Sequence, residues 1–251
     1  MIPWLADGQA FPQVDAALRT PNGLLAASLD LTAERLVAAY SEGIFPWYAE
    51  GEPVLWWTPD PRMVLYCAEL RVSRSLRKTL RRIGRGAGIE IHLDRAFGDV
   101  MAACAAPRAG ESGTWITPAV RSAYGELHRR GFAHSVETWI DGRLAGGLYG
   151  VCIGRMFYGE SMFARVPDAS KIALVALVSM LLREGVPMLD CQQNTRHLTS
   201  LGGREIARHQ FCAHVRQAVR EAPIDWSRYR GCLNELLDAA ATHGPADLIA
   251  D

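Results

Sequence analysis

Three segments of the chain have apolar residues at helical spacing and are bounded by residues that cap or end helices. They are residues 31–41, 119–130 and 169–184. Asp30 or Thr32 is the expected N-cap of the first segment, and Gly43 is expected to end it. Asp168 or Ser170 is the expected N-cap of the third segment. Apolar residues lie on all sides of this segment, which predicts a buried helix.

Other apolar runs are short and predict strands. They are residues 135–139, two runs within 144–163, and residues 186–192. Gly154 and Arg155 separate the two middle runs and suit a tight turn, so residues 144–163 are expected to form a hairpin. Strands and hairpins mixed with one long buried helix predict an α+β or mixed α/β domain.

Length and composition exclude several classes of protein. The chain has 251 residues, 49% apolar and 22% charged, which fits one large domain or two unequal ones and no disordered chain. The longest apolar run, 172–182, falls well short of the roughly 20 residues of a membrane span. No secretory signal is visible, and the six cysteines form no CxxC pair. We therefore expect a cytoplasmic chain with reduced cysteines, no zinc site and no membrane span.

The net charge of zero hides an uneven distribution of arginine. Residues 71–85 hold seven basic side chains and no acid. Five of these side chains recur at helical spacing, opposite an apolar stripe, and predict binding to a phosphate backbone: Arg74, Lys78, Arg81, Arg82 and Arg85. The alternative is an ordinary solvated face, but such a face normally carries interspersed acids.

An acid that directly follows an apolar strand is a candidate for chemistry. In an ideal strand Asp190 and Gln192 would share one face, with Cys191 on the other. The competing interpretation is that Asp190 only caps a helix that begins near Asn194. A cysteine nucleophile at Cys191, with His197 as its base, is a weaker hypothesis because buried free cysteines are common.

Glu160 lies in the apolar hairpin, where a carboxylate needs a partner or a function. One interpretation is a buried ion pair with an arginine, and the other is a role in substrate binding. Four tryptophans lie in polar segments rich in Pro and Gly, where they either stack on nucleobases or fill space between domains: Trp47, Trp56, Trp57 and Trp115.

Motifs for common cofactors are missing from the sequence. It contains no GxGxxG string and no Walker A loop. An acetyl-CoA acyltransferase would show a pyrophosphate loop of the type Q/R-x-x-G-x-G/A before a helix. The nearest match, residues 143–148, ends in Leu and precedes a strand, so the usual cofactor site of that fold is not expected.

A series of short motifs resembles the bacterial leucyl/phenylalanyl-tRNA–protein transferases. The likeness runs in order through residues 12–215, and its most specific strings are GIFPWY (43–48), LWWTPDPR (55–62) and GESMF (159–163). Further matching strings are SRSLRK (73–78), GTWIT (113–117), GGLYG (146–150), DCQ (190–192) and HLTSLGGREIAR (197–208). The sequence departs from the family pattern at residues 27–30, Ala164 and Asp168. These departures bear on substrate preference more than on the chemistry.

The resemblance implies a function and a fold. Members of this family transfer Leu, Phe or sometimes Met from aminoacyl-tRNA to the N-terminal Arg or Lys of a protein, which is then degraded by the N-degron route. The implied enzyme is a cytoplasmic monomer without metal or cofactor. Its implied fold is α+β, with a small N-terminal domain (1–65), a mixed-sheet domain (66–222) similar to Gcn5-related acyltransferases, and a tail (223–251) of unassigned role.

The resemblance also implies roles for individual residues. Asp190 and Gln192 match the catalytic pair of the family, and Glu160 is placed to meet the cationic N-terminus of the acceptor. Trp47 and Trp115 match the tryptophans that hold the terminal adenosine of tRNA. The implied aminoacyl pocket is apolar and is lined by Phe157, Met162 and Leu174. The residues alone leave two alternatives open, a non-enzymatic RNA-binding protein and an acyl-CoA N-acyltransferase.

Overall fold

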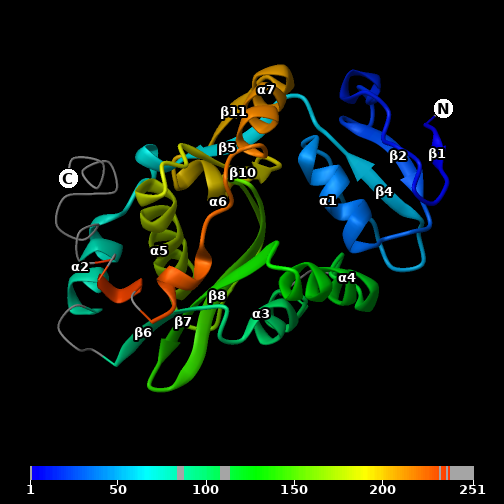
Figure 1. The fold of residues 1–251 in the computed structure, drawn as a ribbon. Coiled ribbons are helices and arrows are strands. Elements are labelled where there is room, and N and C mark those ends of the chain that lie inside the picture. Colours follow the sequence, from blue (N-terminus) through cyan, green and yellow to red (C-terminus); the bar gives the residue numbers. More distant parts are fainter. Residues whose placement is uncertain (1, 84–87, 108–113, 232, 236, 238–251) are drawn as a thin grey trace.

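Two β-sheets organise the chain (Figure 1). The computed structural model describes residues 2–83, 88–107, 114–231, 233–235 and 237. The smaller sheet has the order β1 (Trp4–Leu5), β2 (Leu24–Ser28), β4 (Val54–Trp57), β3 (Phe45–Pro46). The larger sheet has the order β11 (Arg204–Ile206), β5 (Arg62–Tyr66), β10 (Met188–Gln192), β9 (Met156–Ala164), β8 (Arg143–Ile153), β7 (Ala133–Ile140), β6 (Ile89–Leu93).

Both sheets are mixed. In the larger sheet β9 and β10 run parallel, and every other neighbouring pair runs antiparallel. The expected hairpin is confirmed as β8 and β9, which turn at Gly154 (φ 58°) and Arg155. A single parallel pair follows from the sequence order, because helix α5 separates β9 from β10 and brings the chain back across the sheet. The α+β prediction with mixed sheets is therefore confirmed.

Seven α-helices precede residue 220 in the described part of the chain. They are α1 (Ala33–Ser41), α2 (Arg74–Ile83), α3 (Phe97–Cys104), α4 (Pro118–Arg129), α5 (Ala169–Arg183), α6 (Arg196–Ser200) and α7 (Arg208–Ala218). Thr32 caps α1 as predicted, with its hydroxyl accepting from the Arg35 N–H. Asp168 is the N-cap residue of α5, as predicted, but its side chain forms no capping hydrogen bond. Asp168 precedes that helix in a left-handed conformation (φ 66°), and its carboxylate binds Lys171 Nζ at 2.8 Å instead.

The two faces of the larger sheet are covered by different helices. Helix α5 packs on β7, β8 and β9 from one side, and α3 packs on the same strands from the other side, next to α4 (Figure 1). Adjacent residues of β8 therefore belong to different cores: Leu148 to the core under α5, and Tyr149 to the core under α3 and α4. In the described residues, no helix has both the length and the apolar surface needed to cross a bilayer.

The predicted domain limits stay a prediction, but two features bear on them. Strand β5 begins at Arg62 and already belongs to the larger sheet. The tail begins with a 3₁₀ helix, Trp226–Tyr229, which packs on the core. The Trp226 ring stacks on His134, with the ring centroids 4.0 Å apart. The first part of the tail is therefore an integral part of the fold.

Candidate active site

One cavity of about 700 Å³ gathers residues that lie far apart in the sequence. It is bounded by β3 of the smaller sheet, by β8, β9 and β10 of the larger sheet, by α5 and by the segments after β3 and β10. Eight residues that the sequence predicted for the site line it: Trp47, Trp115, Phe157, Glu160, Met162, Leu174, Asp190 and Gln192. The structure thus brings all of them to one place, while their individual roles stay predictions.

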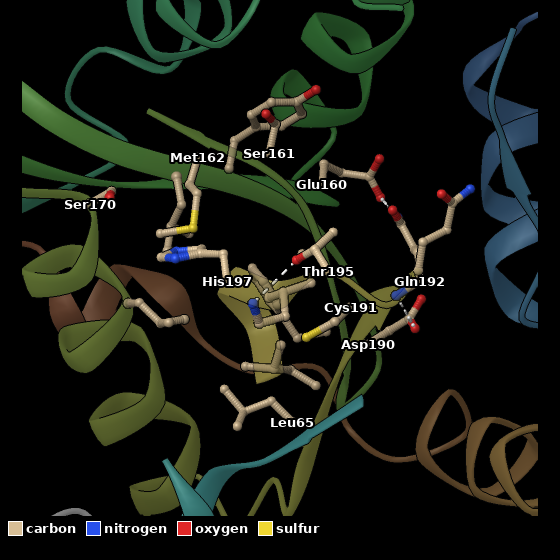
Figure 2. Close-up of a pocket in the computed structure, with 18 of the residues that line it drawn as sticks. Leu65, Glu160, Ser161, Met162, Ser170, Asp190, Cys191, Gln192, Thr195 and His197 are labelled. Carbon is tan, nitrogen blue, oxygen red and sulfur yellow. Dashed lines mark hydrogen bonds between the residues drawn. The ribbon is translucent and has the colours of Figure 1, made fainter. Parts of the chain in front are cut away.

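The cavity has an apolar part and a polar part. Phe157 and Leu174 are buried in its wall, and Met162 is partly exposed. The other apolar side chains of this wall are Leu65, Leu148, Leu177 and Leu189. In Figure 2, Met162 lies toward one side of the cavity, and Glu160 and Gln192 lie toward the other. An apolar group and a polar or cationic group could therefore occupy the cavity together.

Asp190 is held in a buried ion pair with Arg62. Arg62 Nε donates to Asp190 Oδ1 at 2.8 Å, and Nη2 donates to Oδ2 at 2.6 Å. Neither side chain has exposed surface. Burial alone would lower the pKa of Arg62, but the charge and hydrogen bonds of Asp190 outweigh it and the net shift is upward. Arg62 therefore stays cationic, and both carboxylate oxygens of Asp190 are occupied.

Strand β10 becomes irregular where the chemistry was predicted. Its register against β5 shifts between Asp190 and Gln192, and Gln192 has a φ of 62°. The simple alternation that placed the two side chains on one face is therefore wrong at this point. The two residues are joined instead by a hydrogen bond from the backbone N–H of Gln192 to Asp190 Oδ1 at 2.9 Å. Asp190 does not cap the next helix, because Thr195 caps α6.

Glu160 binds hydroxyl and amide donors rather than a cation. Its carboxylate accepts from the hydroxyls of Tyr40 (2.7 Å) and Tyr124 (3.2 Å), and from Gln192 Nε2 (2.8 Å). Burial raises the pKa of Glu160 to about 7, the negative charge of Asp190 adds to the rise, and the three hydrogen bonds oppose it. Within the described residues, Glu160 forms no ion pair, so the alternative of a buried pair with an arginine is wrong for this part of the chain.

The tryptophans divide into two groups. Trp56 is fully buried and donates from its indole to Ser28 Oγ at 2.9 Å, and Trp57 is also buried. These two fill the core of the smaller sheet. Trp47 is 44% exposed at the cavity and is fixed by Trp57, whose indole donates to the Trp47 carbonyl at 2.7 Å. Trp47 and the partly buried Trp115 therefore offer aromatic faces to a ligand.

Sequence reasoning missed three residues of the site. Arg62, Tyr40 and Tyr124 are buried and reach Asp190 or Glu160 across more than thirty residues of sequence. Arg62 is the last residue of LWWTPDPR, a string that carries the family likeness. The charged residue at the end of this family-like string was the available signal for Arg62.

The hypothesis of a Cys191 nucleophile with His197 as its base gains no support from the structure. Burial raises the pKa of the Cys191 thiol, and the neighbouring charge of Asp190 raises it further, so the thiol stays protonated. Burial lowers the pKa of His197, and Lys171 lowers it further. Among the residues that the structure describes, no group of three His, Cys, Asp or Glu side chains is arranged to hold a metal.

The basic segment is a helix with two distinct faces. Helix α2 buries Leu76, Leu80 and Ile83 as predicted. Four predicted basic residues are exposed, Arg74, Lys78, Arg81 and Arg82, and none of them forms an ion pair with another described residue. The fifth, Arg85, lies outside the described residues. None of these four side chains forms part of the cavity wall, so a ligand that contacts both α2 and the cavity must be large.

Comparison with solved structures gives weak similarities. The structure of L-PGS from Bacillus licheniformis matches with a TM-score of 0.37 and 13% identity, covering 66% of this chain and 51% of that chain. A GCN5-related N-acetyltransferase from Kribbella flavida matches with a TM-score of 0.34 and 13% identity, covering 73% of this chain and 65% of that one. Similarity of this size supports no statement about function, and the likeness to Gcn5-related acyltransferases stays a prediction.

Sequence comparisons are far stronger. The chain is 58% identical over 251 residues to the leucyl/phenylalanyl-tRNA–protein transferase of Burkholderia pseudomallei (strain 668), covering 98% of both chains. It is 57% identical over 234 residues to that of Bordetella petrii, covering 91% of this chain and 92% of the other. The family model "Leucyl/phenylalanyl-tRNA protein transferase" matches residues 64–216, and the model of its N-terminal domain matches residues 29–60. On this identity along its whole length, the chain belongs to the leucyl/phenylalanyl-tRNA–protein transferase family.

Proposed function

We propose that this chain transfers leucine, phenylalanine and, less readily, methionine from aminoacyl-tRNA to the N-terminal Arg or Lys of proteins. The family assignment supports an aminoacyltransferase. The observation that carries the substrate assignment is that an apolar wall, two aromatic side chains and a carboxylate meet in one cavity. The enzyme acts in the cytoplasm as a monomer, without cofactor, and its products enter the N-degron route of degradation.

The reaction needs positioning more than activation, because an aminoacyl ester is already reactive. The neutral α-amine of the acceptor attacks the ester carbonyl carbon, a C–N bond forms, and the C–O bond to the terminal ribose breaks. The amine loses a proton, which ends on the departing ribose oxygen, directly or through water. Holding the two substrates in line contributes several kcal/mol to the lowering of the barrier.

Gln192 is suited to orient the attacking amine. Its Nε2 is engaged with Glu160, and within the described residues its Oε1 accepts no hydrogen bond. The amide oxygen is therefore free to accept from the amine N–H as it approaches the ester. An amide oxygen is a poor base, so Gln192 positions the amine and does not deprotonate it.

Glu160 is suited to receive the positive charge of the acceptor. A cationic side chain or ammonium close to this carboxylate would supply the charged partner that its tyrosine and glutamine neighbours do not. The apolar wall of Phe157, Met162 and Leu174 would bind the aminoacyl side chain, and charged aminoacyl groups would be rejected by the loss of their hydration.

The exposed basic face of α2 supports the assignment of tRNA as the donor. Its free cations can bind phosphates of the tRNA body, while Trp47 and Trp115 hold the terminal adenosine in the cavity. Contacts with phosphate carry no sequence information, which suits an enzyme that accepts several different tRNAs.

Transfer of radiolabelled leucine from Leu-tRNA to a peptide that begins with Arg tests the proposal. The proposal predicts labelled peptide, no transfer from Asp-tRNA, and no transfer to a peptide that begins with Glu. Retention of tRNA without transfer would show a non-enzymatic RNA-binding protein. Activity with acyl-CoA alone would show an N-acyltransferase of the other kind. Both results would contradict the proposed function.

A further inference from the structure

Gln192 lies at the centre of a tight turn in a conformation that residues with a side chain rarely adopt. Its φ is 62°, and the Gln193 N–H donates to the Cys191 carbonyl at 2.7 Å, two residues back. A three-residue turn with positive φ at its centre is the strained form of the γ-turn. Such strain persists only where the surrounding structure over-determines the conformation. Something must therefore hold Gln192 in place.

The Asp190 carboxylate holds the turn. The Gln192 N–H donates to Asp190 Oδ1 at 2.9 Å, which fixes the peptide that precedes the strained residue. The carboxylate itself cannot rotate, because Arg62 donates to both of its oxygens at 2.8 Å and 2.6 Å. A two-point contact of this kind fixes orientation as well as charge.

Arg62 is itself fixed from three directions. Its Nη1 donates to the Gly43 carbonyl at 3.1 Å. Its guanidinium carbon lies 4.7 Å from the ring centroid of Phe45 and 4.4 Å from that of Phe211. Gly43 and Phe45 belong to the segment that carries Trp47 into the cavity. The Arg62 side chain therefore connects two parts of the site. One is the segment that carries Trp47, the predicted platform for adenosine, and the other is β10, which ends in Gln192.

We infer that Arg62 is a positioning residue of the transfer reaction. Through Asp190 it holds Gln192 in its strained turn, and through Gly43 it fixes that turn relative to the Trp47 segment. The kinetic part of this inference rests on the proposed function. Lysine cannot replace this arginine, since an ammonium keeps the charge but cannot bind both carboxylate oxygens and the Gly43 carbonyl in the same plane.

Arg62→Lys tests the inference, with Arg35→Lys as a matched control. Arg35 is also buried, pairs with Asp30 at 2.8 Å and lies over the Phe11 ring, but it does not line the cavity or contact Asp190. Rates are referred to the folded fraction measured by circular dichroism. We expect Arg62→Lys to lower kcat at least about tenfold, with the KM of each substrate changed less than about threefold. Arg35→Lys should lower the melting temperature and leave kcat per folded molecule within about twofold.

The crystal structure of Arg62→Lys gives a second readout that does not depend on activity. We expect Gln192 to relax to a negative φ and to lose its hydrogen bond to Asp190. An unchanged turn, or a folded variant with the kcat of the parent, would overturn the inference. If the parent enzyme fails to transfer leucine, the proposed function is wrong, and the structure of the variant still decides whether Arg62 holds the turn.

A milder variant covers the case in which Arg62→Lys does not fold. Phe211→Leu removes one aromatic wall beside the guanidinium and leaves the ion pair with Asp190 in place. Phe211 does not line the cavity. We expect a folded protein with kcat reduced about threefold and both KM values unchanged. A folded Phe211→Leu variant with unchanged kcat and an unchanged Gln192 turn would overturn the inference.

Discussion

Glu160 shows how burial can tune the charge of a carboxylate, here the one that we propose receives a cationic substrate. With a pKa raised to about 7, it is largely protonated at pH 6 and largely ionised at pH 8. Its donors, Tyr40 and Tyr124, stay neutral over this range because burial and the charge of Glu160 raise their pKa values well above 10. The carboxylate is therefore the group in this cluster whose charge changes near neutral pH.

The first prediction concerns the pH dependence of acceptor binding. Because Glu160 loses its charge as the pH falls through 7, the KM of an Arg-peptide should rise about tenfold between pH 8 and pH 6. Glu160→Gln should raise this KM already at pH 8 and leave only the pH dependence that comes from the α-amine of the acceptor, with the KM of Leu-tRNA nearly unchanged. Equal changes in both KM values would show that Glu160 is only structural.

The second prediction separates Asp190 from its neighbour Cys191. Asp190→Ala should lower kcat at least about tenfold, and it should also lower stability by about 3–5 kcal/mol because the buried Arg62 loses its partner. Cys191→Ser should keep most of the activity, since its thiol stays protonated. Single-turnover transfer and urea unfolding measure both effects. An inactive Cys191→Ser beside an active Asp190→Ala would contradict these roles.

The third prediction concerns the choice of amino acid. Met162 lines the apolar part of the cavity, and its replacement by Ala makes room for a larger aminoacyl side chain. Each buried methylene stabilises binding by roughly 0.8 kcal/mol, so the ratio of kcat/KM for Phe-tRNA over Leu-tRNA should rise several-fold in Met162→Ala. Val166→Ala, at an exposed position outside the cavity, should leave this ratio unchanged.

At the scale of elements, local signals in the sequence were sufficient for helices and hairpins. Thr32 caps α1 and Gly154 turns the β8–β9 hairpin as predicted, because both effects act within a few residues. The bulge at Gln192 could not be predicted, since it depends on Arg62, 128 residues from Asp190 in the sequence. Similarly, Glu160 meets Tyr40 only after α1 packs near β9, so its partners lay beyond any local pattern.

The fourth prediction concerns the binding of tRNA by α2. If its exposed cations neutralise about three to five phosphates, log affinity should fall with log salt with a slope near −3 to −4, at about 0.9 per contact. Arg81→Ala with Arg82→Ala should reduce the slope by about one to two for all tRNAs alike. The control pair, Arg129→Ala with Arg130→Ala, removes arginines already paired with Glu126 and Glu34 and should leave the slope unchanged. An unchanged slope in the α2 variant would show that this helix does not contact tRNA.

At the scale of the whole molecule, the cavity depends on parts of the chain that do not line it. Trp226, in the segment after α7, packs against Phe157 with ring centroids 5.8 Å apart, and Phe157 forms part of the apolar wall. Tyr229 in the same segment donates to Glu184 just after α5. The tail therefore supports the apolar wall of the cavity from behind, while Arg62 supports the side that holds Gln192.

The last prediction follows from this support. Trp226→Ala removes a buried ring that touches His134 and Phe157, and should lower the free energy of unfolding by about 3–5 kcal/mol. Phe157 then gains room to move, so discrimination between Leu-tRNA and Phe-tRNA should weaken. The control, Trp4→Ala, removes a ring that is 56% exposed and should change stability by less than about 0.5 kcal/mol. Urea unfolding and paired transfer assays measure the two effects. If Trp226→Ala is as stable as Trp4→Ala, the tail does not support the pocket.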